Sequence, residues 1–452
     1  MARRISQGDT AFACWVRKYI QPTLRTNKAK DQRELRLVVD LAALLRLGLE
    51  QDPFLEHGGQ LETFRKRVRT FISTWGDRVL YWVLETGPNR FKHVSDSIKM
   101  NHELMQVLKE KTSKDSIVFS PPAASFVLFS ELKRAGHGTL VLVSESAYGS
   151  DVICWLCEEY GAVPASDSGE FLMALPKTLL LPSHDQAWLY ERASICFRLG
   201  IGEQWSPLFN RLIGRREVPG LFEDRGWDRF LRIAQYINAP KNHYLFEPRC
   251  EPSQTIEFVE FECNDMDRDD LEEDDEFSFV EDFALRMWYE HWLFNPNQKH
   301  LVLPVLGERS DPPSIFVRTA PLRHSVLTCR LGSHCPREEH VPGYDPIPIE
   351  STRVPPTDLS QAVALVCAEE GKSFENYEAE SIESLVDAAL LATRFYYPGF
   401  ALKGNRAPLP DSYLFFQHVL MEFQSCFPLL EIPEEVFVDG SSLVVKAGED
   451  MY

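Results

Sequence analysis

The sequence predicts a mixed α/β protein of several domains, and three observations support this class. The chain has 452 residues, more than a single hydrophobic core usually serves. Its hydrophobic fraction of 44% and aromatic fraction of 12% are typical of globular proteins. In the middle of the chain, short apolar runs alternate with stretches of helical periodicity, which is typical of parallel strands joined by crossover helices.

The first 115 residues are predicted to form a helical, net basic domain. Apolar residues recur at helical spacing in three segments, 31–50, 61–85 and 95–111. Basic residues outnumber acidic ones in this part, although the whole chain has a formal net charge of −19. This division of charge predicts contacts with charged partners and does not by itself select a fold.

Residues 116–240 are predicted to form an α/β domain with a parallel sheet. The apolar runs 116–120 and 139–144 flank a helix that Pro121 and Pro122 open and Gly136 ends. A second helix follows, with Ser150 as the expected cap and Gly161 as the expected end. Further strands are predicted at 170–175 and 177–181, followed by helical segments between 188 and 236.

The remaining sequence divides into three predicted parts. Residues 241–322 are predicted to be rich in strands, at 255–262, 301–306 and 314–318, with an acidic loop at 257–282. Residues 323–357 are rich in Pro and His and are expected to be a linker or long loop. Residues 358–452 are expected to form two helices, 381–395 and 411–426, and a hairpin at Asp439 and Gly440.

Two loops of the predicted parallel sheet are candidates for a ligand site, because ligands of open α/β sheets bind beyond the carboxyl ends of the strands. One loop follows Ser120, and the other follows Ser144 and precedes a helix whose free N–H groups attract anions. No glycine-rich phosphate motif accompanies either loop. The candidate residues are Ser120, Ser144, Glu145, Ser146 and Ser150.

A basic cluster on the predicted helix 61–85 is the candidate contact for nucleic acid or an acidic partner. It comprises Arg65, Lys66, Arg67 and Arg69. Apolar residues on the same segment recur at helical spacing, so a solvated helix face is the simpler interpretation. A third interpretation is that this helix docks on the acidic run 257–282 of the same chain.

Cysteine and histidine are densest between residues 324 and 340, where thiolate and imidazole donors could bind zinc. The candidate ligands are His324, Cys329, His334, Cys335 and His340. Their spacing differs from that of paired zinc knuckles, so a polar loop is the alternative, and we predict no cofactor. Four carboxylates also have the spacing of a calcium loop, namely Asp265, Asp267, Asp269 and Glu276. Asp270 replaces the glycine that such a loop needs at its turn, so a solvated acidic loop is expected there instead.

The sequence lacks the nucleophile motifs of hydrolases and kinases. We therefore expect a non-catalytic scaffold or assembly subunit of an intracellular complex, with protein partners. Two alternatives stay open: a nucleic-acid-binding protein that uses the basic helix, and an α/β enzyme or small-ligand binder that uses the loops after Ser120 and Ser144. Scattered cysteines and the absence of a long apolar run predict a cytoplasmic or nuclear protein without membrane contact.

Overall fold

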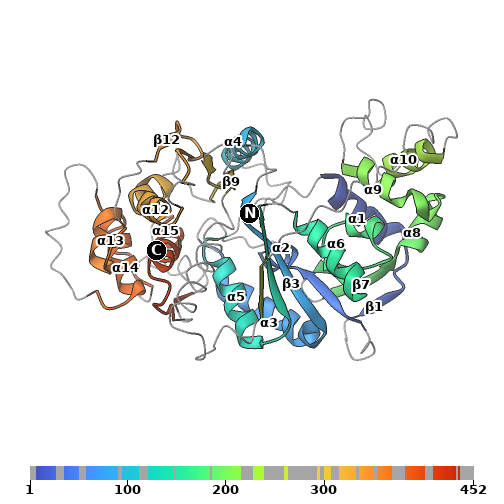
Figure 1. Cartoon of the computed structure of the whole chain (residues 1–452), viewed down its shortest axis with the longest axis horizontal. Coiled ribbons are helices and arrows are strands. Elements are labelled where there is room, and N and C mark those ends of the chain that lie inside the picture. Colours follow the sequence, from blue (N-terminus) through green and yellow to red (C-terminus); the bar gives the residue numbers. More distant parts are fainter. Residues whose placement is uncertain are drawn as a thin grey trace, which may run out of the picture.

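The computed structural model places an eight-stranded sheet at one side of the protein and a group of helices at the other (Figure 1). The structure describes residues 7–26, 35–49, 58–89, 94–110, 121–145, 148–183, 186–214, 228–238, 259–262, 293–295, 300–306, 315–331, 335–349, 355–368, 382–402, 411–433 and 436–437. None of the helices in these ranges is both long and apolar enough to cross a membrane.

The large sheet has the strand order β1-β7-β6-β5-β2-β3-β4-β8. Its strands are β1 (Leu24–Thr26), β2 (Leu37–Asp40), β3 (Val79–Asn89), β4 (Thr139–Glu145), β5 (Val163–Ser166), β6 (Lys177–Ser183), β7 (Gln186–Glu191) and β8 (Val259–Glu262). The five strands from β6 to β4 in this order are parallel, and the others pair antiparallel at the two edges. The predicted parallel sheet is therefore confirmed.

Helices cover both faces of the parallel strands, which explains why their sequences are almost continuously apolar. In β2, Leu37 and Val39 face a core formed with α2 (Leu41–Leu49), α3 (Leu61–Trp75) and α5 (Ala124–Ala135). Val38 points to the opposite face, against α6 (Gly149–Tyr160) and α7 (Phe171–Ala174). A separate core joins the β6–β7 end of the sheet to α1 (Gln7–Tyr19), α8 (Arg192–Leu199), α9 (Ser206–Gly214) and α10 (Asp228–Asn238).

The described residues of the C-terminal part form a second sheet and four helices. The sheet has the order β12-β11-β10-β9 and consists of β9 (Leu293–Asn295), β10 (His300–Val302), β11 (Glu338–His340) and β12 (Ile347–Pro348). The helix α4 (Val94–Glu110) contacts β9 and β10. The four helices are α12 (Ile315–Leu331), α13 (Leu359–Val366), α14 (Leu385–Tyr396) and α15 (Ser412–Cys426), and they share the core of α2, α3 and α5.

Several predicted elements need correction. The first 115 residues are not only helical, because β2 and β3 are central strands and pair with strands from beyond residue 115. The apolar residues of both strands are buried between two layers of helices, so their apolar runs also fit helical spacing. The strands predicted at 170–175 and 314–318 are instead occupied by α7 and the start of α12, and α12 and β11 occupy much of the predicted linker. Of the predicted acidic loop at 257–282, residues 259–262 form β8, and the rest lies outside the described residues, as does the hairpin at 439–440.

Other predictions are confirmed by the structure. The helix after Pro121 and Pro122 ends at Gly136, which adopts the left-handed conformation with φ of 63°. The helix that the sequence ends at Gly161 does so with φ of 62°, although Tyr148 and not Ser150 precedes its first turn. The C-terminal helices at 385–396 and 412–426 also lie where helical spacing predicted them.

Candidate functional site

The candidate site lies where the order of the parallel strands reverses. From β2 the chain adds β3 and β4 on one side of the sheet and then β5 and β6 on the other. The connection after β2 therefore leads to one side of the sheet, and the connection after the neighbouring strand β5 leads to the other side. The two connections diverge at the carboxyl ends of these strands. In doubly wound sheets a ligand crevice forms at this topological switch point.

Asp40 is the last residue of β2, and helix α2 begins at the next residue. Its Oδ1 atom accepts hydrogen bonds from the backbone N–H groups of Ala42 (3.0 Å) and Ala43 (3.3 Å). Its Oδ2 atom accepts a hydrogen bond of 2.9 Å from the hydroxyl of Ser166, the last residue of β5. Asp40 thus caps α2 with one oxygen and spans the switch point with the other.

Glu85 of β3 has the same relation to helix α6. It is buried, with 5% of the residue exposed, and its Oε2 atom accepts a hydrogen bond of 3.1 Å from the backbone N–H of Gly149. A Cβ atom at position 149 would lie 3.3 Å from the Cβ atom of Glu85, so glycine allows this close approach. Both helix N-termini at the switch point are therefore occupied by carboxylates of the protein itself.

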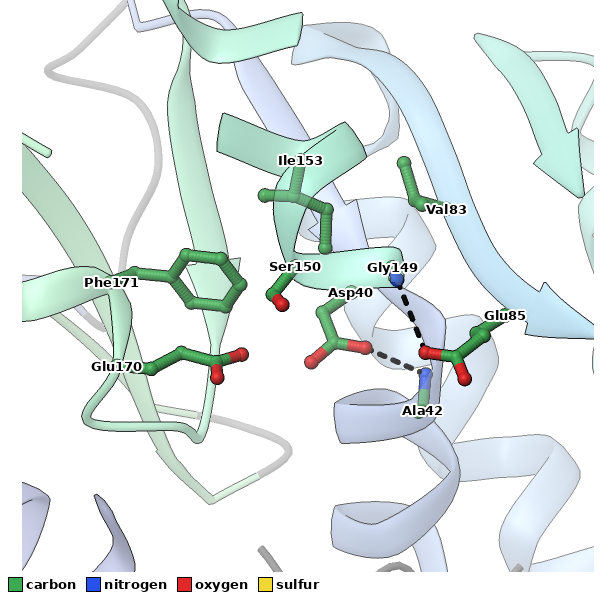
Figure 2. Close-up of a pocket in the computed structure, with 9 residues that line it drawn as sticks. All are labelled: Asp40, Ala42, Val83, Glu85, Gly149, Ser150, Ile153, Glu170 and Phe171. Carbon is green, nitrogen blue, oxygen red and sulfur yellow. Dashed lines mark hydrogen bonds between the residues drawn. The ribbon is translucent and has the colours of Figure 1, made fainter. Parts of the chain in front are cut away.

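A cavity of about 10 Å³ lies between these carboxylates, and Glu170 adds a third one. Figure 2 shows the carboxylates of Asp40, Glu85 and Glu170 gathered at one level, with the hydroxyl of Ser150 beside them. The hydrophobic wall is formed by Val83, Ile153 and Phe171. A cavity of this size has room for one water molecule or an ion of similar size.

Arg46 supplies positive charge behind the crevice. Its guanidinium group donates hydrogen bonds to both carboxylate oxygens of Asp167, at 2.6 and 3.0 Å, and lies 3.7 Å from Asp40. Burial disfavours the charged form of Arg46, but the Asp167 carboxylate outweighs this effect and raises the pKa of Arg46 above its usual value. Arg46 therefore offsets part of the charge of Asp40, and the carboxylates of Glu85 and Glu170 keep the crevice acidic.

The structure places the predicted loop residues unevenly around this site. Ser150 lines the cavity, and Ser144 and Glu145 are the last two residues of β4. Ser120 and Ser146 lie outside the described residues. Asp40 and Glu85 were not predicted as site residues, because the apolar spacing of their segments predicted helices. A carboxylate directly after each apolar run, in LVVD and YWVLE, is the pattern that could have identified both.

The predicted basic cluster is largely engaged within the protein. Arg65 is only 5% exposed, although a solvated face was expected, and its guanidinium lies 3.5 Å from Glu131 of α5. Arg69 donates two hydrogen bonds to the same carboxylate, and Arg67 donates one to the backbone carbonyl of Gly48. The partner of this helix is thus α5 in the described part of the chain, and most of the acidic run lies outside that part.

The three predicted zinc ligands whose side chains the structure describes do not form one group of donor atoms. His324 lies in α12, is buried, and contacts Glu339 through its Nε2 atom at 2.9 Å. His340 lies on β11 and contacts His300 instead. Cys335 lies 3.9 Å from the hydroxyl of Thr328. Cys329 belongs to α12, its side chain is not described, and His334 and the proposed calcium ligands lie outside the described residues.

His324 belongs to a buried ionic network that links α12, β11 and α15. Arg323 is fully buried at its centre and forms ion pairs with Glu339 and Glu422, which are also fully buried. His418 lies 3.0 Å from Glu422 and 3.1 Å from the hydroxyl of Thr319. Burial disfavours ionised Glu339, but the nearby Arg323 charge prevails and lowers the pKa of Glu339 to about 2.

Cys154 and Cys157, spaced as in a C-x-x-C motif, both lie on α6. Cys157 is buried in the core and Cys154 is partly buried. Burial, followed by the charges of Glu170 and Asp151, raises the pKa of Cys154 to about 12. A thiol with so high a pKa stays protonated at neutral pH and is a poor nucleophile.

Comparison with known proteins adds no family. No family model matches this chain. No curated protein matches its sequence at a significant level either. The fold and the residues of the crevice are therefore the basis for any functional assignment.

Proposed function

We propose that the switch-point crevice binds a hard divalent cation such as Mg²⁺ or Mn²⁺, and that the chain is an α/β ligand binder or enzyme acting on a phosphate-bearing molecule. The observation that carries this proposal is a cavity at the switch point that is lined by three carboxylates, from the end of β2 (Asp40), from within β3 (Glu85) and from the residue before α7 (Glu170). Oxygen ligands of this kind suit hard cations, and Mg²⁺ sites often use one or two carboxylates together with phosphate oxygens and water.

The arrangement of the helix ends supports a cation over a bare phosphate. A phosphate would bind free N–H groups at a helix N-terminus, but Asp40 and Glu85 already accept hydrogen bonds from those of α2 and α6. The same hydrogen bonds fix the orientation of both carboxylates, as outer-shell contacts do at metal sites. A cation would lower the repulsion among the carboxylates and attract a phosphate group, which it could activate for hydrolysis.

A binding experiment tests the cation step. We expect millimolar Mg²⁺ or Mn²⁺ to raise the Tm of the full chain, because a ligand of the native state stabilises it. Asp40→Asn should abolish most of this rise while leaving the fold intact, since asparagine also caps helices. Glu85→Gln should act alike, because its amide oxygen can still accept the Gly149 N–H. Exposed Asp77→Asn, which alters a carboxylate 88% exposed, is the control and should retain the rise.

Hydrolysis of bis(4-nitrophenyl) phosphate in the presence of Mn²⁺ separates an enzyme from a binder. Activity that Asp40→Asn removes supports the enzyme. Cation binding without activity supports a binder. A Tm that does not respond to either cation, or responds equally in Asp40→Asn, contradicts the proposal.

The second candidate is the scaffold or assembly subunit that the composition suggests. The observation that favours it is Phe197 on α8, whose side chain is 89% exposed. Large exposed aromatic residues often anchor protein interfaces. We expect a protein retained from native extract in a fixed ratio by the wild-type chain to be lost with Phe197→Ser and kept with the nearby Arg198→Ser. Equal retention by both variants would remove Phe197 as the anchor.

A further inference from the structure

We infer that His300, Glu338 and His340 form a zinc site on β10 and β11, the two central strands of the small sheet, separate from the switch-point crevice. Among the described residues, these three are the group of histidine, cysteine and carboxylate side chains whose donor atoms all lie within 4.8 Å of one another. Two imidazoles and one carboxylate are a ligand set that zinc uses when a fourth position is left for water.

The strand register explains why the three side chains meet. Strands β10 and β11 are parallel, with His300 opposite Glu338 and Val302 opposite His340. Because side chains alternate along a strand, Glu338 and His340 share one face of β11. Glu339 points to the other face, where it is fully buried against Arg323. The register thus collects His300, Glu338 and His340 on one side and separates them from the ionic network.

One atom, Nδ1 of His300, lies close to donor atoms of both other residues. The Nδ1 atom of His300 lies 2.9 Å from Nε2 of His340 and 3.4 Å from Oε2 of Glu338. A ring nitrogen has one proton or one lone pair, so Nδ1 can make a well-directed hydrogen bond to only one of these two partners. A metal ion between the three atoms would bind all of them. Tetrahedral zinc with bonds of about 2.0–2.1 Å separates its ligand atoms by roughly 3.3 Å, so the two histidines need to move apart by only a few tenths of an ångström.

The surroundings suit zinc ligation. All three side chains are partly exposed, His300 to 33% and Glu338 to 46%, so an ion can enter and water can occupy the fourth position. The nitrogen donors favour zinc over the oxygen-seeking Mg²⁺.

Metal titration of the full chain tests this site. Metal is first removed with a chelator, and the chelator is then removed by dialysis. We expect the wild-type chain to bind one equivalent of Zn²⁺ in calorimetry. We also expect Co²⁺ to give the visible absorption of a four-coordinate site. His300→Ala and His340→Ala should each lose this equivalent, and Glu338→Gln should weaken it about tenfold or more. His137→Ala is the control, because His137 is an exposed histidine with one carboxylate neighbour, Asp77, at 3.1 Å.

The two proposed metal sites are distinguishable. Asp40→Asn should leave Zn²⁺ binding unchanged, whereas His340→Ala should leave the Mg²⁺ response of the crevice unchanged. If His300→Ala fails to fold, His300→Gln is used in its place, and circular dichroism shows whether that variant is folded. Absence of Zn²⁺ binding in the wild-type chain, or full binding by both folded histidine variants, overturns the inference.

Discussion

Replacing Arg323 with methionine is expected to lower the free energy of unfolding by about 3–5 kcal/mol, because removing one partner of a buried ion pair leaves a buried charge uncompensated. The guanidinium of Arg323 is fully buried and donates to Glu339, Glu422 (2.7 Å), the hydroxyl of Thr319 (2.8 Å) and the carbonyl of Phe316 (2.6 Å). Methionine fills a similar volume but donates to none of them. Urea unfolding followed by circular dichroism measures the loss.

Two further variants show whether the effect comes from the network. Arg337→Met changes an exposed arginine near the same strand and should leave the free energy of unfolding nearly unchanged. Replacing Arg323, Glu339 and Glu422 together with Met, Leu and Leu should recover only part of the loss. An apolar core can replace buried ion pairs at little cost, but His324 and His418 lose their carboxylate partners. A loss of less than about 1 kcal/mol for Arg323→Met, as for an exposed pair, would contradict the central role of this residue.

The network also shows what the sequence could not predict about the C-terminal part. Arg323, His324 and Glu339 lie in a segment rich in Pro and His, whose composition is typical of a loop. In the structure this segment is stabilised by ion pairs with Glu422, which is 99 residues further along the chain. Long-range pairing of charges leaves no periodic pattern in the sequence. The short apolar run at 315–318 fits a strand as well as the start of a helix. The sequence does not distinguish the two, and in the structure these residues begin α12.

The parallel sheet was more accessible to prediction, because its signals are local. An apolar run between a glycine and a polar loop identified β4, and glycines in the left-handed conformation marked the ends of α5 and α6. The central strand β2 was not predicted, because it is only four residues long and α2 follows it directly. The apolar residues of the two elements together fit one helix. Asp40 was missed with β2. The crevice depends on which strands are neighbours, and strand order is a property of the tertiary structure.

Acid is expected to destabilise the protein through Glu339, and the sign follows from its pKa. The pKa of a glutamate carboxyl group in the unfolded chain is about 4.5, whereas Arg323 and His324 lower the pKa of folded Glu339 to about 2. The unfolded state therefore binds a proton first as the pH falls. The stabilisation is complete above about pH 4.5 and is lost as the pH falls toward 2, by about 1.4 kcal/mol per pH unit between these values.

Glu339→Gln isolates this contribution from those of the other carboxylates. Glutamine does not titrate, so the difference in the free energy of unfolding between the wild type and Glu339→Gln should shrink by about 1.4 kcal/mol between pH 4 and pH 3. In metal-free protein the matched variant is Glu338→Gln, the neighbouring residue that faces away from Arg323, and its difference from the wild type should change much less. A difference for Glu339→Gln that stays constant over this pH range would mean that Arg323 does not hold Glu339 ionised. The cost of Arg323→Met would then come from lost hydrogen bonds and packing, because no carboxylate charge would be left uncompensated.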